Sequence, residues 1–239
     1  MRLKLLVLLD QYRWQDNSGM KKSTKERIIK KAVELFNRQG YANISLQDIA
    51  NEMGMSRGNL AYHFSEKDLL LKSIVDQVWE RMAEESQKRR NFPSFQNVHN
   101  EVKLYHALHL AYSFIFGDLR VLKHPILRQQ FKASSLQSIK DNEEAIAYGI
   151  QIGSMKAEPF PGIYYNLALI IWMLSIFWIP QQSIRDQEIT QDPTKAVWTL
   201  MLPYLTEKGV RSFKKVFGED YFDSLGAPFR VNLDHLEIF

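Results

Sequence analysis

The polar residues with the clearest chemical use lie in residues 46–64, LQDIANEMGMSRGNLAYHF. At 100° per residue, Leu60 and Phe64 point to one side of a short helix, while Gly58 and Tyr62 point to the opposite side. With Arg57 in the first turn and Asn59 on the flank, a side that carries arginine, glycine, asparagine and tyrosine is unusual for a merely solvated helix, which usually displays glutamate and lysine. A short connector helix with incidental polar residues is the alternative interpretation.

The same side of this helix suits the major groove of DNA. Arg57 can form a bidentate contact with guanine and Asn59 one with adenine, while Gly58 permits close approach to the base edges. Tyr62 can contact a thymine methyl group or a phosphate, and His63 a phosphate. Taken alone, this tyrosine could equally pack inside the protein, and a lone histidine often only satisfies local hydrogen bonds.

A helix-turn-helix would position these side chains. Ser45 is a candidate N-cap with Asp48 at the capping-box position, and Ser56 would cap the second helix. Gly54 can adopt the left-handed conformation of a tight turn between helices. Ala50, four residues earlier, is small enough to let the two helices approach closely. The segment therefore predicts a helix-turn-helix.

Helix signals also dominate the rest of the chain and predict an all-α protein. The expected helices cover approximately residues 23–38, 45–53, 56–64, 66–90, 96–117, 125–154, 161–180 and 193–217. Pro203 predicts a kink in the last of them. Residues 1–20 are interpreted as a poorly ordered N-terminal extension, and residues 219–239 as a loosely packed C-terminal tail.

The charge distribution favours a polyanionic partner for the first third of the chain. Between Lys21 and Lys67 there are nine basic and five acidic residues, an excess equal to the formal +4 of the whole chain. Lys22 and Lys25 lie at the start of the first expected helix, where they could follow a phosphate backbone. Taken alone, these lysines would be interpreted as a solvated face.

Composition excludes several kinds of active site. The chain has no cysteine, so disulfides, thiolate zinc sites and cysteine nucleophiles are ruled out. We find no paired acid and base, nucleophile motif or phosphate-binding loop, and we expect no enzyme activity and no cofactor. His106 and His109 lack a carboxylate at ligand spacing, so no metal site is expected. A helical carrier or enzyme with a coincidental helix-turn-helix is the rival class.

Residues 163–179, IYYNLALIIWMLSIFWI, form a long apolar run. A membrane span needs about 20 such residues, and no clusters of lysine or arginine flank this run. We therefore expect a buried helix in a cytoplasmic protein that does not contact a membrane. A membrane-anchored regulator is the alternative. Residues 1–9 lack the long apolar core and cleavage site of a secretory signal.

Residues 24–71 resemble the tetracycline-repressor (TetR/AcrR) family of bacterial transcriptional regulators. The matching segments are IIKKAVELFNRQGY, SLQDIANEMGMS and RGNLAYHFSEKDLLL. The resemblance implies an all-α homodimer with a three-helix DNA-binding head, residues 21–67. A long helix would join this head to a helical effector-binding and dimerisation body, residues 68–218. It also implies a ligand-responsive repressor of a palindromic operator in double-stranded DNA, with a small apolar effector.

The resemblance also assigns roles to individual residues. Carried over by position, contacts to bases or nearby backbone come from Gln47, Arg57, Gly58, Asn59 and Tyr62, and contacts to phosphates from His63 and Lys67. The chain departs from the family at Ala61, where an aromatic residue usually precedes Tyr62. Because this change removes one contact, the operator sequence cannot be taken from relatives.

In the body, the resemblance implies an effector pocket and a dimer interface. Aromatic side chains that could line an apolar pocket are Tyr112, Phe116, Phe131, Tyr164, Trp172 and Phe177, although the same rings could simply fill the core. For the dimer we expect the apolar run of residues 163–179 beside one stripe of residues 193–217. That stripe contains Ala196, Val197, Leu200, Met201 and Tyr204.

Overall fold

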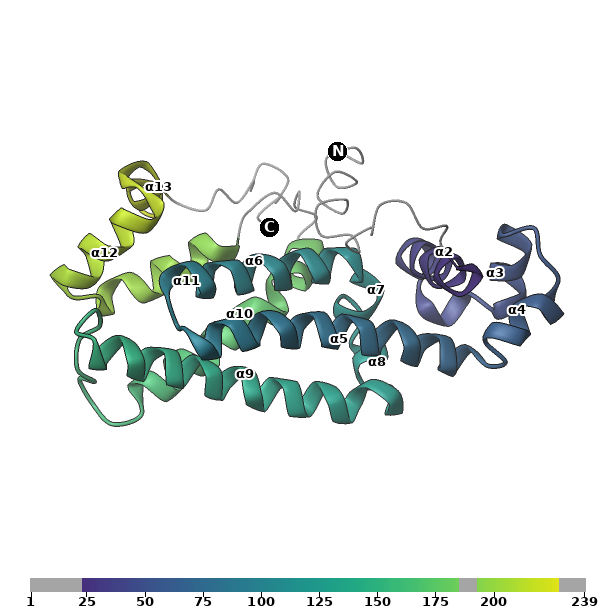
Figure 1. Ribbon diagram of the computed structural model, residues 1–239, viewed down its shortest axis with the longest axis horizontal. Coiled ribbons are helices and arrows are strands. Elements are labelled where there is room, and N and C mark those ends of the chain that lie inside the picture. The colour runs from purple at the N-terminus through teal and green to yellow at the C-terminus, as the bar shows by residue number, and fades with distance from the viewer. Residues whose placement is uncertain (1–22, 185–192, 228–239) are drawn as a thin grey trace, which may run out of the picture. The chain divides into compact units, whose positions relative to one another are not determined.

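The computed structural model describes residues 23–184 and 193–227 (Figure 1). Within those ranges the regular elements are all helices, which confirms the all-α prediction. In chain order the α-helices are α2 (Thr24–Gln39), α3 (Leu46–Glu52), α4 (Arg57–His63), α5 (Lys67–Asn91), α6 (Phe95–Ala111), α7 (Ser113–Phe116), α8 (Leu119–Leu122), α9 (Pro125–Gln151), α10 (Ile163–Ile184), α11 (Pro193–Met201), α12 (Glu207–Phe217) and α13 (Glu219–Ser224). Two 3-10 turns, η1 (Tyr41–Asn43) and η2 (Leu202–Tyr204), complete the order. The expected extension, residues 1–20, and Lys22 lie outside the described residues.

The chain divides into two compact units. Unit 1 comprises Met1–Ala83 and Ala107–Ser134, and unit 2 comprises Glu84–His106 and Ser135–Phe239. Helices α2, α3, α4, α7 and α8 belong to unit 1, whereas α10 to α13 belong to unit 2. The division into a head and a body at residue 67 describes expected functions and not compactness, and it stays a prediction.

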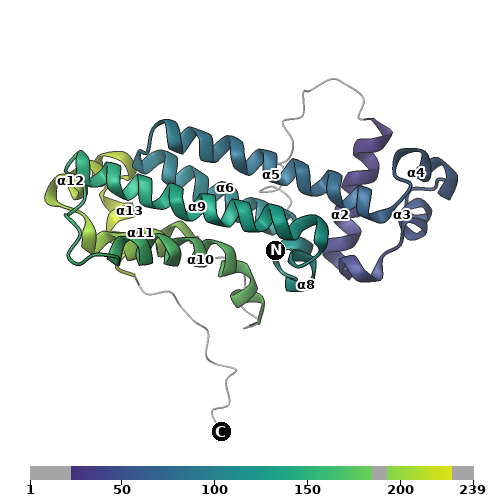
Figure 2. The same ribbon diagram turned by 90° about the horizontal axis from the view of Figure 1, so that it is seen from below.

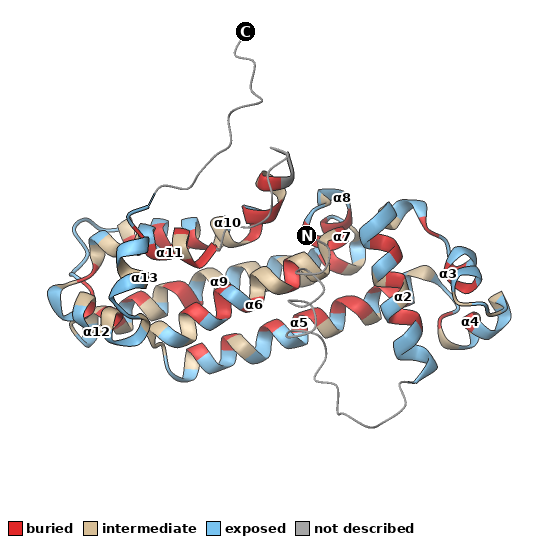
Figure 3. Cartoon of the chain, turned by 90° about the horizontal axis from the view of Figure 1, so that it is seen from above, coloured by how far each residue is buried: buried red, intermediate tan, exposed pale blue. Residues whose placement is uncertain are grey.

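Helix α2 begins at a capping box and turns an apolar stripe inward. The Ser23 hydroxyl accepts a hydrogen bond from the Glu26 backbone N–H, and the Glu26 carboxylate accepts one from the Ser23 N–H. Ile28, Ala32 and Phe36 on this stripe are fully buried. Figure 3 shows buried positions of α2 in red. The spacing of apolar residues therefore fixes which side of α2 faces the interior of unit 1.

One asparagine fastens α2 to the junction between α6 and α7. The Asn37 side-chain amide donates to the Ala111 carbonyl at 2.7 Å, and its oxygen accepts from the Phe114 backbone N–H at 3.0 Å. The Ser113 hydroxyl lies 3.2 Å from the same oxygen. Beside these bonds the rings of Phe36 and Phe114 pack with their centroids 5.1 Å apart. The first helix of the expected head is thus held to residues 107–134 within unit 1.

Unit 2 has its own hydrophobic core, to which α6, α9, α10, α11, α12 and the segment after α13 contribute. Val197, Trp198 and Phe213 are each at most 3% exposed. The rings of Phe95, Trp198 and Phe213 meet edge to face, with centroid distances of 5.2 to 5.8 Å. Such aromatic contacts add to the stabilisation that burial of the rings provides.

The single kinked helix predicted over residues 193–217 is in fact two helices. Helix α11 ends at Met201, the 3-10 turn η2 contains Pro203, and α12 begins after Thr206. Proline cannot donate a backbone hydrogen bond, and its ring clashes with the preceding turn. The Thr206 hydroxyl then accepts from the Gly209 N–H, which starts a new helix instead of continuing the old one.

The expectation of a loosely packed tail is wrong where the chain is described. Residues 219–224 form α13, and Leu225, which follows it, is only 3% exposed. Tyr221 and Phe222 pack against the core of unit 2. The mixture of aromatic and polar residues in this segment is that of an amphipathic turn of helix. Residues 228–239 lie outside the described residues.

Helix α12 approaches the loop after α9 so closely that only glycine fits at the contact. A Cβ atom added at Gly209 would lie 2.0 Å from the Ser154 carbonyl oxygen. We expect Gly209→Ala to lower the free energy of unfolding by about 3 kcal/mol, because backbone must move to relieve the overlap. Urea unfolding followed by circular dichroism measures this change.

Gly149→Ala is the matched control for this prediction. Its added Cβ would meet the flexible side chain of Met155 at 2.9 Å, which can rotate away. We expect a cost of at most about 1 kcal/mol. If Gly209→Ala and Gly149→Ala lowered the free energy of unfolding equally, the contact between Gly209 and Ser154 would be no tighter than that between Gly149 and Met155.

Candidate DNA-binding interface

Helices α3 and α4 pack together as a helix-turn-helix beside α2 (Figure 2). Gly54 in the turn has φ 64°, and Ala50 is fully buried, as the sequence predicts. The Met55 N–H donates to the Ala50 carbonyl at 3.0 Å, which closes the turn. The Ser56 hydroxyl accepts from the Asn59 N–H at 3.1 Å and caps α4. The local geometry therefore confirms the predicted motif.

Helix α4 presents the predicted side to solvent. Leu60 is fully buried and Phe64 is 3% exposed, so these two residues anchor the helix in unit 1. On the opposite side Tyr62 is 88% exposed, and Gly58 and Asn59 are also exposed. An exposed tyrosine ring of this kind loses the stabilisation that burial would give it. Its position therefore needs an explanation other than packing in this chain.

Arg57 does not lie on this exposed side as a free guanidinium group. Its Nη2 donates to the Ser65 carbonyl at 3.2 Å, and its Nη1 is buried. A bidentate contact with guanine would require this bond to break. In this structure the residue ties the start of α4 to the segment that follows the helix, and the base contact of Arg57 stays a prediction.

Lys67 is likewise occupied within the head. Its ammonium group donates to the Tyr41 carbonyl and lies 4.0 Å from the centroid of the Tyr41 ring. Burial lowers the pKa of Lys67, although Asp68 and Asp48 act in the opposite direction. Burial also raises the pKa of Tyr41, whose hydroxyl lies 3.1 Å from Asp68. This ammonium group joins η1 to α5, and its contact with a phosphate stays a prediction.

Three other predicted residues keep accessible positions near the exposed side. Gln47 is exposed on α3 and donates to the Asn51 side chain at 2.7 Å. Lys25 is exposed, with its ammonium group 5.6 Å from the centroid of the Phe64 ring. His63 is half-buried, with its ring edge against Tyr62. Asn51, which binds Gln47, is not among the DNA contacts predicted from the sequence. Its spacing of four residues from Gln47 nevertheless places both on one face of α3.

The aromatic residues expected to line an effector pocket do not line the cavity that unit 2 contains. That cavity, of about 210 Å³, is surrounded by a different set of residues from six helices. Phe116 is buried in unit 1, where it stacks on Trp79. The Tyr164 hydroxyl donates to the Lys156 carbonyl, and Phe177 is 40% exposed. Tyr112, Phe131 and Trp172 are also absent from the cavity wall.

The expected dimer stripe is corrected in the same way. Ala196, Val197 and Met201 are at most 8% exposed, because they pack into the core of unit 2. Leu200 and Tyr204 are only partly buried, but they too pack against this core. The stripe therefore faces its own subunit.

An exposed apolar face lies instead on α10. Ile170, Met173 and Phe177 are 46%, 45% and 40% exposed, and their spacing of three and four residues puts them on one side of the helix. We call these three residues the α10 face. The same helix turns Leu167, Ala168 and Ile171 inward. The long apolar run thus has one side buried in unit 2 and one side that the described residues leave exposed.

Two family models cover most of the chain. The model of bacterial regulatory proteins of the tetR family matches residues 28–74, and that of a bacterial transcriptional repressor of the TetR type matches residues 75–213. The second match alone covers more than half of the sequence. The chain belongs to the TetR family. The first match contains the helix-turn-helix described above, and the second contains both the cavity and the α10 face.

Individual relatives of this TetR-family protein agree with that assignment. A TetR-family transcriptional regulator from Marinobacter aquaeolei VT8 has a similar fold, with a TM-score of 0.71 and 22% identity over 84% of this chain and 99% of that one. The SmeT–triclosan complex is similar with a TM-score of 0.60 and 16% identity, over 78% of this chain and 93% of that one.

Curated relatives match less than half of the chain, between 22% and 46% of it. IcaR of Staphylococcus aureus, the negative transcriptional regulator of the biofilm operon icaADBC, is 26% identical over 46% of this chain and 54% of its own length. The chain spans between 18% and 54% of the length of these curated relatives. The family is therefore established, and the operator and effector are matters for proposal.

Proposed function

We propose that this TetR-family protein is a cytoplasmic, ligand-responsive repressor that binds a palindromic operator as a homodimer. The observation that carries the proposal is the exposed side of α4, where Tyr62 is 88% exposed and Gly58 and Asn59 lie beside it. An α-helix fits the major groove, where asparagine can bind adenine through two hydrogen bonds. Tyr62 would contact a thymine methyl group or the backbone. His63 and Gln47 would support these contacts from the flank.

The α10 face supports the homodimer. Ile170, Met173 and Phe177 form an apolar surface on a long helix, which favours contact with the same surface of a second copy about a twofold axis. Two copies would then present two α4 helices to two half-sites. Leu200 and Tyr204 are partly buried against the core of unit 2, so the proposed dimer contact is assigned to the α10 face and not to these two residues.

The names of two relatives support repression and a small effector. IcaR is named a negative transcriptional regulator, and SmeT is solved in complex with triclosan. We infer that a small apolar molecule bound in unit 2 favours a shape of this protein that binds DNA less well. Ligand and operator would then oppose each other through a coupling of about 1–3 kcal/mol.

A membrane anchor is the rival use of α10. Ile163–Gln182 is one helix, among the described residues, that is long and apolar enough to cross a membrane, and a third of it is buried. A dimer contact and a membrane span make opposite predictions for the purified chain. Full-length protein that stays in the supernatant without detergent supports the dimer, and protein that requires detergent supports the anchor.

Selection of bound DNA from a random pool tests the proposed function. We expect an inverted repeat, with one half-site for each α4. Asn59→Ala should relax the preference at one position of each half-site and weaken binding there by about 1–3 kcal/mol, because one base contact is lost. Titration of the selected operator against single-base variants measures this change.

Lys25→Gln is the matched control for Asn59→Ala. Lys25 is exposed near the start of α2, outside the helix α4 that is proposed to contact the bases. Its replacement should weaken all sequences equally and reduce the slope of log affinity against log salt by about one per subunit, or about two for the dimer. Uniform weakening by Asn59→Ala would instead make Asn59 a backbone contact, and a pool without an inverted repeat would contradict the dimeric operator.

A further inference from the structure

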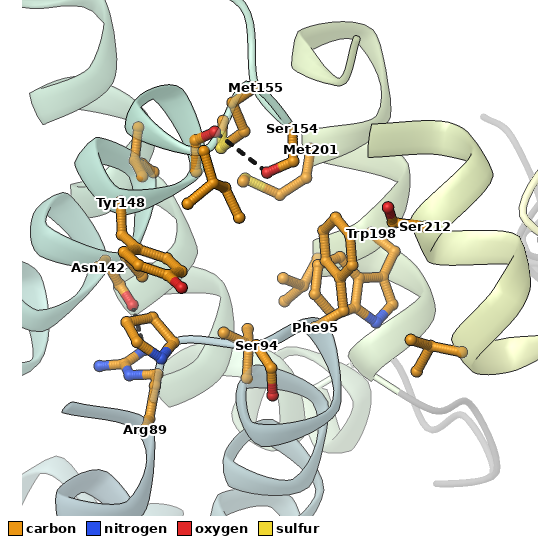
Figure 4. A pocket seen from close by; sticks show the side chains of 18 of the residues that line it. Arg89, Ser94, Phe95, Asn142, Tyr148, Ser154, Met155, Trp198, Met201 and Ser212 are labelled. Atoms are coloured by element: carbon orange, nitrogen blue, oxygen red, sulfur yellow. Dashed lines mark hydrogen bonds between the residues drawn. The ribbon is translucent and has the colours of Figure 1, made fainter. Parts of the chain in front are cut away.

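Unit 2 contains a cavity that none of the pocket residues expected from the sequence lines. It measures about 210 Å³ and is enclosed by side chains from α5, α6, α9, α10, α11 and α12 (Figure 4). Most of its wall is apolar and includes Phe95, Ile146, Met155, Trp198 and Met201. Every lining residue belongs to unit 2, so the cavity is a property of that unit alone.

The buried charged group in this wall is already paired within the protein. Arg89 is 4% exposed, and its Nε lies 2.8 Å from a Glu101 carboxylate oxygen. Its Nη1 donates to the Asn142 side chain at 2.8 Å, and Asn142 in turn donates to the Ala168 carbonyl at 3.0 Å. Lys208 is exposed, and its ammonium group donates to the Ile152 carbonyl. A charged group in the interior of the cavity would therefore meet no unpaired buried counter-charge and would lose its hydration without compensation.

Two hydroxyl groups of the wall remain available for a ligand. The side chains of Tyr148 and Ser212 line the cavity from α9 and α12, and neither hydroxyl has a hydrogen-bond partner within the described parts of the chain. The Ser154 hydroxyl, by contrast, is used locally, since it donates to the Gly149 carbonyl at 3.1 Å. The cavity thus offers a large apolar surface and a few free hydroxyls, the composition of a site for an organic molecule with one polar group.

The volume limits the size of that molecule. At about 210 Å³ it lies below the range of about 300–1,000 Å³ that is typical of sites for drug-sized ligands, so it suits a smaller molecule. We infer that this cavity binds a compact, uncharged, mainly apolar molecule whose single polar group hydrogen-bonds to Tyr148 or Ser212. That the molecule is also the effector rests on the proposed function.

Helix α10 gives the cavity a route to the proposed dimer contact. Ile171 lines the cavity, whereas Ile170 and Met173 on the same helix belong to the α10 face. A helix moves as a rigid rod over a few turns, so a ligand that displaces Ile171 also displaces the α10 face. Binding in the cavity would therefore change the spacing of the two subunits.

Calorimetric titration of the full-length protein, without DNA, tests the inference. The uncharged probes are p-cresol, benzyl alcohol and indole, and the charged analogues are p-toluate and benzoate. At least one uncharged probe should bind at about 1 mM or below, and its charged analogue at least tenfold more weakly. Tyr148→Phe and Ser212→Ala identify the hydroxyl, and one of them should weaken the bound probe by about fivefold.

Two substitutions on α9 form the matched pair for this experiment. Ala145 lines the cavity, and Ala147, two residues later, is exposed. Ala145→Leu should fill the space and abolish binding, while Ala147→Leu should leave it unchanged. Failure of every uncharged probe, equal binding of a charged analogue, or undiminished binding to Ala145→Leu would each overturn the inference. Because no DNA is present, these outcomes are independent of operator binding, and release of the operator by the bound probe is measured separately.

Discussion

Replacing Met173 with glutamate should dissociate the proposed homodimer and, with it, abolish tight operator binding. Met173 is 45% exposed at the centre of the α10 face, between Ile170 and Phe177. In a twofold dimer the face meets its own copy, so each subunit would bring a carboxylate into an apolar contact. An unpaired buried carboxylate costs several kcal/mol, and the affinity of the dimer should therefore fall by about 10³-fold.

Sedimentation over a range of protein concentrations measures this loss, with circular dichroism to show that the helices remain. Met173→Leu keeps the face apolar and should remain dimeric. Leu136→Glu adds the same charge at a side chain of α9 that is 61% exposed and should also remain dimeric. Wild-type dimerisation of the Met173→Glu variant would exclude the α10 face as the interface.

The features that the sequence predicts well are those decided within a few residues. Ser45 and Ser56 cap helices through bonds to residues three positions away, and Gly54 takes a conformation that its own missing side chain permits. The outward side of α4 follows from the spacing of Leu60 and Phe64 alone. These local rules place the motif, the turn and the exposed Tyr62 side without any knowledge of the rest of the fold.

The features that the sequence misses depend on contacts between distant residues. Nothing in the spacing indicates that Lys67 reaches the carbonyl and the ring of Tyr41, 26 residues earlier. In α10 nearly every residue is apolar, so the pattern has no polar side that would reveal which face is buried. The spacing therefore cannot show that Met173 and Phe177 lie on the exposed side of this helix while Ile171 lies on the buried side.

A buried charge network in unit 2 is another feature of this kind. Arg89 on α5, Glu101 on α6 and Asp141 on α9 are each at most 4% exposed. Arg89 pairs with Glu101 at 2.8 Å, and Asp141 pairs with Arg90 at 2.9 Å. The Ser86 hydroxyl donates to Glu101 at 2.6 Å. Three helices are thus joined by charges that would be costly to bury singly.

Arg89→Met should lower the free energy of unfolding by about 3–5 kcal/mol, because the substitution leaves the Glu101 carboxylate buried without its cation. Urea unfolding at neutral pH measures the change. Lys88→Met is the control on the same helix, since Lys88 is exposed and pairs with Glu85 at the surface. Its loss should cost at most about 1 kcal/mol. A second substitution, Glu101→Gln, should recover part of the stability that Arg89→Met loses.

The pH dependence of this loss separates charge from packing. Burial raises the pKa of Glu101, and the neighbouring Arg89 opposes the rise. Without Arg89 the pKa rises further, and protonation of Glu101 then removes the unpaired charge. A carboxyl group whose pKa is raised on folding stabilises the folded state at low pH. The stability that Arg89→Met loses is therefore largest above the raised pKa of Glu101. It becomes smaller as the pH falls toward the ordinary carboxyl pKa of about 4.3. A deficit that is equal at about pH 5 and about pH 7.5 would mean that lost packing of the Arg89 side chain, and not the charge on Glu101, sets the cost.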